Sequence, residues 1–141
     1  MAALLWLPFS SHADYGSATV ARVTSIVDGD TFRADIEGWP AVIGERIPVR
    51  IEGINTPEMR SQCPTPEQQE REKALAREAK QFTVAALRDA ERIQLHEIER
   101  GSFFRILARV TVDGRDLGDK LMEAGLARPY RPGASKTQWC Q

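Results

Sequence analysis

The stretch TVARVTSIVDGDTFRADI, residues 19–36, contains the clearest fold signal in this sequence. Its first half is rich in Val, Ile and Thr, and its second half alternates apolar with polar residues, which is typical of half-buried strands. Between the halves lies Asp28-Gly29, a dipeptide that favours a type I′ hairpin turn because glycine accepts a positive φ. The stretch therefore predicts a β-hairpin with one buried and one solvated face.

Three further strands are predicted after this hairpin, over residues 47–51, 93–95 and 104–112. The first and last alternate apolar and polar residues, and the last begins with Phe104. Pro48 cannot donate a backbone N–H, so it indicates a sheet edge or a bulge in the first of the three. In the same strand, Arg50 is expected on the face opposite the apolar residues.

Two helices are also predicted. Thr65-Pro66-Glu67-Gln68 combines an N-cap, a proline at the first helical position and a capping-box glutamine, so a helix should run from here to about residue 90. Its charged residues, including Glu72, are assigned to the solvated face. A short helix near residues 117–122 should end at Gly125 in the left-handed conformation. The buried face of the long helix is predicted from an apolar stripe of Leu75, Ala79, Phe82, Ala86 and Ala90.

The predicted order is three strands, a long helix, two strands and a short helix. This is the order of a mainly β, five-stranded Greek-key OB-fold barrel with the long helix between strands three and four. Such barrels commonly bind oligonucleotides or oligosaccharides. Because a fold alone does not define a function, particular residues have to decide it.

Length and composition restrict the class of protein. The chain has 141 residues, 19 Lys plus Arg, 20 Asp plus Glu and a net charge of -1. These values are ordinary for one globular domain and argue against a disordered chain or a membrane protein. They also argue against a protein that coats nucleic acid through a basic excess, though a local site with both signs of charge is compatible with them.

The N-terminus has the pattern of a processed segment. Residues 1–9 form an apolar run, and Ser11-His12-Ala13 is a small-residue cleavage pattern, so residues 1–13 are interpreted as the remnant of a signal peptide. The alternative is a hydrophobic N-terminal strand. Residues 14–141 are then a single domain with no membrane span, periplasmic or secreted. In that oxidising environment Cys63 and Cys140 could form a disulfide, the alternative being two unrelated thiols.

Three short stretches hold the residues best suited to chemistry. Asp28-Gly29-Asp30-Thr31 brings two carboxylates together at a turn, and Asn55-Thr56-Pro57-Glu58 is a turn with oxygen donors that follows Arg50. Gly101-Ser102-Phe103-Phe104-Arg105 delivers an arginine to the start of a strand. Taken singly, each has a more ordinary interpretation, as a hairpin turn, a helix-capping turn or a solvated arginine.

Taken together, the stretches resemble the staphylococcal nuclease (thermonuclease) family. The resemblance covers roughly residues 19–130, with matching order and spacing, and rests on residues 27–31, 49–58, 104–108, 112–114 and 123–127. It implies the OB-fold barrel predicted above and hydrolysis of phosphodiester bonds.

The resemblance also implies a metal site. Asp30 is then a direct ligand of Ca²⁺, the backbone carbonyl of Thr56 is another, and Asp28 lies in the outer shell, since hard oxygen donors suit this ion. The sequence departs from the family at Asn55, where a second aspartate is often found. The Asn55 amide oxygen can still coordinate, but with one negative charge fewer Ca²⁺ should bind more weakly, and another divalent cation is possible.

Further residues acquire roles from the same resemblance. Glu58 matches the general base that activates water, and Arg50 and Arg105 match two arginines that bind phosphate through planar guanidinium groups. Phe103 stands where some members have a tyrosine that contacts the nucleotide. It could still stack on a base, and Tyr130 is a second candidate contact with nucleic acid.

Two functions follow from these residues. The favoured one is a monomeric, metal-dependent nuclease that cleaves single-stranded or duplex DNA and RNA with little sequence preference, because nothing suggests base-edge readout. The alternative is a non-catalytic OB-fold module that binds nucleic acid and has a metal site weakened by Asn55.

Overall fold

The computed structural model describes residues 14–130 and 138–141, so the predicted signal-peptide remnant lies outside the described residues. Within the described parts, every helix is too short or too polar to cross a lipid bilayer. The helices are α1 (Ala41–Gly44), α2 (Pro66–Arg88) and α3 (Leu117–Glu123). The strands are β1 (Ala18–Asp28), β2 (Thr31–Ile36), β3 (Ile47–Ile51), β4 (Ile54–Asn55), β5 (Ile93–Arg100), β6 (Ile106–Val112), β7 (Arg115–Asp116) and β8 (Arg128–Pro129).

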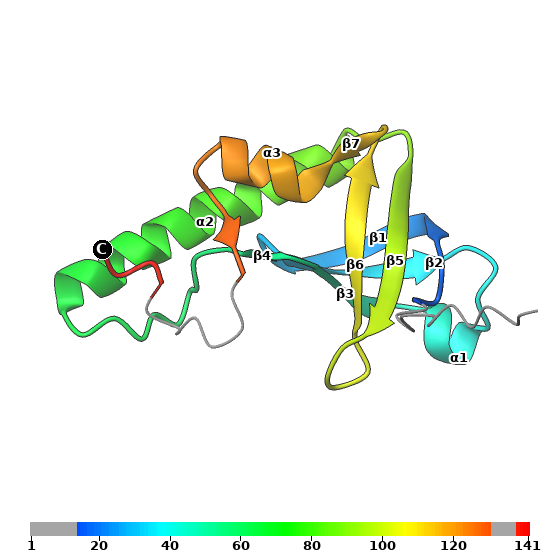
Figure 1. Ribbon diagram of the computed structural model, residues 1–141, viewed down its shortest axis with the longest axis horizontal. Coiled ribbons are helices and arrows are strands. Elements are labelled where there is room, and N and C mark those ends of the chain that lie inside the picture. Colours follow the sequence, from blue (N-terminus) through cyan, green and yellow to red (C-terminus); the bar gives the residue numbers. More distant parts are fainter. Residues whose placement is uncertain (1–13, 131–137) are drawn as a thin grey trace, which may run out of the picture.

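Five of these strands form a closed barrel in the order β3-β2-β1-β5-β6. The barrel closes because residues 49–51 of β3 pair in parallel with residues 106–108 of β6. The long helix α2 lies between β3 and β5 in the chain and α3 follows β7, so the predicted OB-fold barrel with its two helices is confirmed (Figure 1). The short strands β4 and β8 form a separate two-stranded ribbon.

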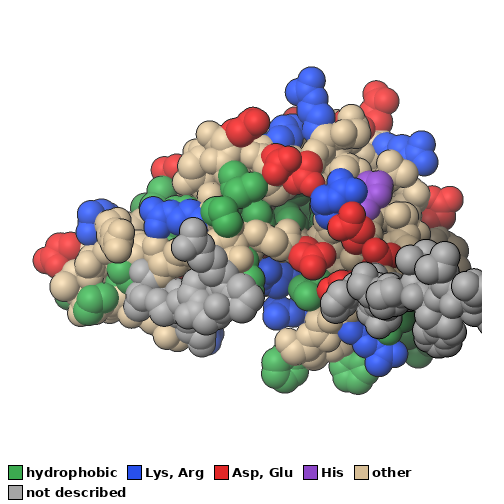
Figure 2. All heavy atoms as spheres, viewed as in Figure 1, with side chains coloured by type: hydrophobic (Ala, Val, Ile, Leu, Met, Phe, Trp, Pro, Cys, Tyr) green, Lys and Arg blue, Asp and Glu red, His purple; other side chains and the backbone are tan. Residues whose placement is uncertain are grey.

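The core fills the barrel and the space between the barrel and its helices. Phe32, Val49, Leu95 and Val110 are fully buried and alternate with more exposed residues along their strands, as a half-buried strand requires. Leu117 and Leu121 of α3 are also fully buried and cap this core. In contrast to the apolar core, the surface is charged: acidic and basic side chains intermix on the face shown in Figure 2.

The β1–β2 turn differs from its prediction. Asp28 pairs with Thr31, so Gly29 and Asp30 are the turn residues, and Gly29 does not adopt the positive φ expected of a type I′ turn. Glycine is needed here for another reason: a Cβ at Gly29 would lie 2.8 Å from Ala79 Cβ. The turn thus packs directly against α2, and Thr83 Oγ1 donates to the Gly29 carbonyl at 2.7 Å.

Helix α2 begins as predicted, with a complete capping box between Thr65 and Gln68. Ala79 of the predicted stripe is buried and the other members are partly buried and pack against the core, but the assignment of Glu72 to the solvated face was wrong. The buried face therefore extends beyond the predicted stripe. Two polar side chains on the buried face find hydrogen-bond partners in the loops beneath it, which makes their burial tolerable. The buried residues are Glu72, Ala76, Ala79, Thr83 and Leu87.

The β5–β6 connection is the other place where the structure corrects the prediction. β5 runs to Arg100 and is longer than expected. Phe104, predicted to begin the next strand, is 97% exposed and has a φ of 59°. Phe103 has a φ of 57°, so the chain reverses here and β6 begins only at Ile106. The predicted end of α3 is confirmed, since Gly125 has a φ of 74°.

Candidate functional site

Asp30 lies at the centre of the candidate site. It is held in the β1–β2 turn, where its own N–H donates to Asp28 Oδ1 at 3.1 Å. Its carboxylate is almost fully buried, accepting from Thr31 Oγ1 at 3.0 Å and from the backbone N–H of Thr56 at 3.3 Å. These bonds connect the hairpin turn to the segment that follows β4, so two of the three stretches singled out in the sequence meet here.

Arg50 of β3 lies beside this carboxylate. Its Nη2 is 3.5 Å from Asp30 Oδ2, because residue 50 pairs with residue 31 across the β2–β3 ladder. The guanidinium also donates to the carbonyls of Ile51 and Ile54, at 3.2 and 3.3 Å. On its other side it stacks over the ring of Tyr130, 5.5 Å from the ring centroid. Arg50 is therefore held rigidly, and Tyr130 belongs to the same site.

The carboxylates of the site repel one another. Burial raises the pKa of Asp28 from 3.8 to about 8, with further contributions from Asp30 and from the charge of Glu58. Glu58 lies two residues after Thr56, whose N–H is bonded to Asp30, and its charge makes the smallest contribution to this shift. A bound cation would relieve this crowding, and every donor in the proposed set, from Asp28, Asp30, Asn55 and the Thr56 carbonyl, is an oxygen. The residues present therefore fit a hard divalent cation.

Asn55 is engaged elsewhere. Its Nδ2 donates to Gln138 Oε1 at 3.1 Å, and Gln138 in turn donates to the Pro129 carbonyl at 3.2 Å. Arg128 donates to the Gln138 carbonyl and stacks over the Trp139 ring at 4.2 Å. The amide of Asn55, at the position where the resemblance implies that an aspartate is often found, is thus bonded to the C-terminal segment.

Arg105 directly precedes β6, one residue before the point where β6 pairs with Val49 of β3. Its Nη2 donates to Ser102 Oγ at 3.5 Å, while its buried Nε has no partner within the described residues. No hydrogen bond or ion pair between Arg105 and Asp30 occurs in the described parts of the chain. Phe103 is 92% exposed on the same connection. Hydrogen bonds and an ion pair therefore join Arg50, Asp28, Asp30 and Thr56, whereas none in the described parts of the chain joins Arg105 or Phe103 to this group.

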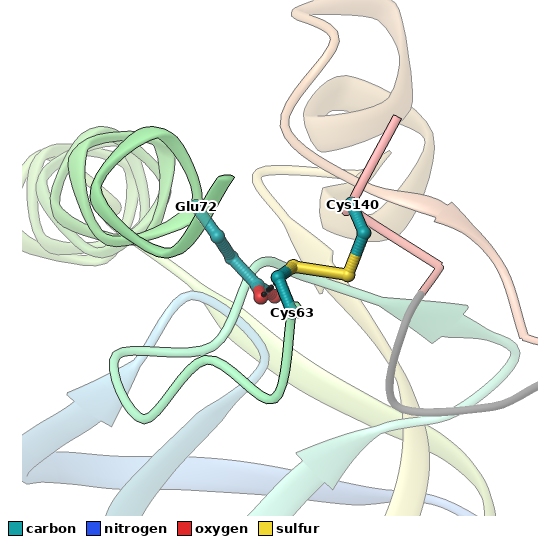
Figure 3. A group of neighbouring side chains, drawn as sticks. All are labelled: Cys63, Glu72 and Cys140. Atoms are coloured by element: carbon teal, nitrogen blue, oxygen red, sulfur yellow. Dashed lines mark hydrogen bonds between the residues drawn. A yellow bond between two sulfur atoms is a disulfide. The ribbon is translucent and has the colours of Figure 1, made fainter. Parts of the chain in front are cut away.

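The predicted disulfide is present. Cys63 and Cys140 are joined with a Cα–Cα distance of 5.3 Å, and both are buried. The bridge attaches residues 138–141 to the loop before α2 (Figures 1 and 3), and the Cys140 carbonyl also accepts from Gln68 Nε2 in the first turn of α2 at 2.8 Å.

Sequence reasoning missed Glu72. This residue is fully buried, and its Oε2 accepts the backbone N–H of Glu58 at 2.9 Å. One signal could have revealed it: Glu72 lies on the same helix face as Ala76, Ala79 and Thr83, whose small side chains indicate close packing.

The fold and the site together define a class, an OB-fold domain with carboxylate oxygens at the turn of its first hairpin and a fixed arginine on the strand that follows. The chain belongs to the staphylococcal nuclease family: the family model described as "Staphylococcal nuclease homologue" matches residues 48–139, more than half of the 141 residues. No curated protein matches the chain.

Proposed function

We propose that this protein is a metal-dependent nuclease that hydrolyses phosphodiester bonds of DNA or RNA. The observation that supports it best is the Asp30–Arg50 pair: one buried carboxylate faces an arginine fixed by two carbonyls. Such a site offers oxygen donors for a cation and, beside them, a guanidinium for a phosphate oxygen. Family membership points to the same class of activity.

The cation in this proposal is Ca²⁺ or another divalent ion. Asp30 and the Thr56 carbonyl would hold it directly, Asn55 through its amide oxygen, and Asp28 from the outer shell. When bound, the ion would neutralise the negative charge of the phosphate. Because Asn55 has no charge and its Nδ2 is bonded to Gln138, we expect affinity below that of a site with a second aspartate.

The chain's own residues have the remaining roles. Arg50 and Arg105 would bind the non-bridging oxygens of the phosphate, and their bonds strengthen as negative charge concentrates there. Glu58 would orient the attacking water and accept its proton. Because carbonyl oxygens already fix Arg50, little reorganisation is needed when substrate binds.

The substrate is proposed to be single-stranded or duplex nucleic acid, read without sequence preference. Exposed Phe103 and half-exposed Tyr130 are suitable for stacking on bases, which is tolerant of sequence. We further infer a monomer formed by a single domain, residues 14–141. The disulfide supports a periplasmic or secreted location, because such bonds persist in oxidising compartments.

A cleavage assay tests the proposal. Purified protein is incubated with single-stranded DNA in Ca²⁺, Mg²⁺, Mn²⁺ or chelator, and products are expected only with a divalent cation. Arg50→Ala, Arg105→Ala and Glu58→Gln should each lower turnover by about 100-fold or more while the protein stays folded at the assay temperature. Arg33→Ala, which removes an exposed arginine of the barrel, is the matched control. Near-normal cleavage by all three site variants would eliminate this mechanism.

The Asn55–Gln138 bond favours a second candidate function, a non-catalytic module that binds nucleic acid. Such a module would use the arginines and aromatic residues but hold no cation efficiently. DNA binding under every condition, without products, would support it.

A further inference from the structure

Glu72 is a buried carboxyl group in the middle of an otherwise exposed run of charge. It has 0% exposure, whereas its neighbours Glu70 and Arg71 are exposed. No ion pair to Glu72 occurs within residues 14–130 and 138–141. Burying a carboxylate without a cationic partner is costly, and a neutral side chain of similar volume is often more stable at such a position. The residue therefore calls for an explanation other than packing.

The contacts of Glu72 point to the loop that contains Glu58. Its Oε2 accepts the backbone N–H of Glu58 at 2.9 Å, and its Oε1 lies 3.4 Å from Cys63 Sγ (Figure 3). A disulfide sulfur has no hydrogen to donate, so the second contact is a weak polar one. The strong bond of this side chain is the one to the main chain of Glu58.

The loop over residues 56–63 has no helix or strand of its own. At its start, the N–H of Thr56 is bonded to Asp30. At its end, Cys63 is fixed by the disulfide and by Gln69 Nε2, which donates to the Cys63 carbonyl at 2.8 Å. Between these points the bond to Glu72 fixes the backbone of Glu58 relative to α2. The direction in which the Glu58 side chain leaves the loop thus depends on a hydrogen bond between its own backbone and α2.

We propose that Glu72 is a positioning residue for the nuclease reaction: its carboxylate holds the backbone of Glu58 so that the Glu58 side chain faces the attacking water. This inference rests on the proposed function and adds a residue to it. A displacement of the order of 1 Å in a reacting group costs about 100-fold in rate, so one hydrogen bond to the loop is enough to matter.

Two substitutions separate positioning from packing. Glu72→Gln keeps an oxygen that accepts the Glu58 N–H, whereas Glu72→Met has similar length and no comparable acceptor. We expect Glu72→Gln to retain kcat within about threefold and Glu72→Met to lose roughly 10- to 100-fold in kcat. KM and cation affinity should stay unchanged in both, because neither substitution touches the proposed phosphate or metal residues. Glu78→Met, at an exposed position of the same helix, is the control and should retain wild-type kcat.

Amide hydrogen exchange gives a readout independent of activity. In ¹⁵N-labelled protein the Glu58 N–H should be protected in the wild type and in Glu72→Gln, and should exchange roughly 10- to 100-fold faster in Glu72→Met. An unprotected Glu58 N–H in the wild type would overturn the inference, even if the Met variant did not fold. Equal kcat in wild type and a folded Met variant, or equal losses in Gln and Met, would also overturn it. Absence of cleavage by the wild type with a protected Glu58 N–H would instead refute the proposed function.

Discussion

The side-chain amide of Asn55 donates to Gln138 Oε1 at 3.1 Å, a bond between residues 83 positions apart. It links the segment that follows β3 and leads to Glu58 with residues 138–141, which contain Cys140 of the disulfide. Asn55, the residue that departs from the family's pattern, therefore contributes a hydrogen bond to the structure of this chain. Replacing it by aspartate should change cation affinity and stability in opposite directions.

Asn55→Asp should raise cation affinity and lower stability. A second carboxylate adds one negative charge to the oxygen donors, so we expect roughly tenfold tighter Ca²⁺ binding by calorimetry. The donor to Gln138 is lost, which should lower the free energy of unfolding by about 1 kcal/mol without cation. Gln138→Ala breaks the same bond and adds no charge, so its gain in affinity should be well below the tenfold gain of Asn55→Asp. An unchanged affinity in Asn55→Asp would contradict the placement of residue 55 in the metal site.

Arg50→Lys should be far from conservative. Lysine cannot bond the carbonyls of Ile51 and Ile54 and still present two donors to a phosphate, so turnover should fall by about 100- to 1,000-fold in a cleavage assay. Arg33→Lys, on an exposed position of β2, should retain full turnover. Comparable turnover in the two variants would remove Arg50 from the mechanism.

Stability without cation should fall as pH rises. The pKa of Asp28 is 3.8 in the unfolded reference and about 8 in the folded protein, because of burial and then of Asp30. Between these values the folded state holds a proton that the unfolded state has lost, so the free energy of unfolding declines through this window and levels off above about pH 8. Urea unfolding in chelator between pH 4.5 and 8.5 should show this slope, and Asp28→Asn should flatten it. Glu37→Gln, at an exposed position, should retain the wild-type slope. An equally steep decline in Asp28→Asn would contradict the assignment.

Loss of the disulfide should be costly. The Cys63–Cys140 bridge spans 77 positions, and closure of a loop this long corresponds to about 4 kcal/mol in the chain-entropy treatment. The Cys63→Ser/Cys140→Ser double variant should lose stability of this order in denaturant unfolding. Reductant should destabilise the wild type similarly and leave the double variant unaffected. A loss below about 1 kcal/mol would show that the unfolded chain is little constrained by the bridge.

Gly29→Ala should destabilise the protein through contact with α2. The added Cβ would lie 2.8 Å from Ala79 Cβ and 3.1 Å from Thr56 Cγ2, and such overpacking typically costs about 1–3 kcal/mol. Ala79→Gly in the same chain removes the closer contact, so the two substitutions should be non-additive and part of the loss should be recovered. Additive losses in chemical denaturation would show that the contact is not the cause.

Much of the fold could be predicted because its signals are local. The capping box at Thr65 and the turn glycine at Gly125 depend only on neighbouring residues, and alternation defined the barrel strands. Phe104 shows where alternation misleads. Its apolar side chain continues the pattern of β6, but the left-handed backbone at residues 103 and 104 takes it out of the strand.

The site was predictable only where residues follow a family pattern. Asp30 and Arg50 meet as that pattern implied. Tyr130 reaches Arg50 through the β4–β8 ribbon, and Glu72 reaches Glu58 through the packing of α2 against a loop. Both contacts depend on tertiary packing, which periodicity along the chain does not encode. Residue type misled as well, because a glutamate in a charged run is normally exposed.

The parallel pairing of β3 with β6 has a consequence for the order in which the protein folds. It joins Val49 to Ile106, far apart in the chain, whereas the β1–β2 hairpin and α2 depend on near neighbours. Long-range contacts pay a larger loop-closure entropy and form slowly. We therefore expect barrel closure to be a late kinetic event. Arg50 and Arg105 lie on the two sides of this seam, so in a nascent or partly folded chain the two arginines proposed to bind phosphate are not yet brought together.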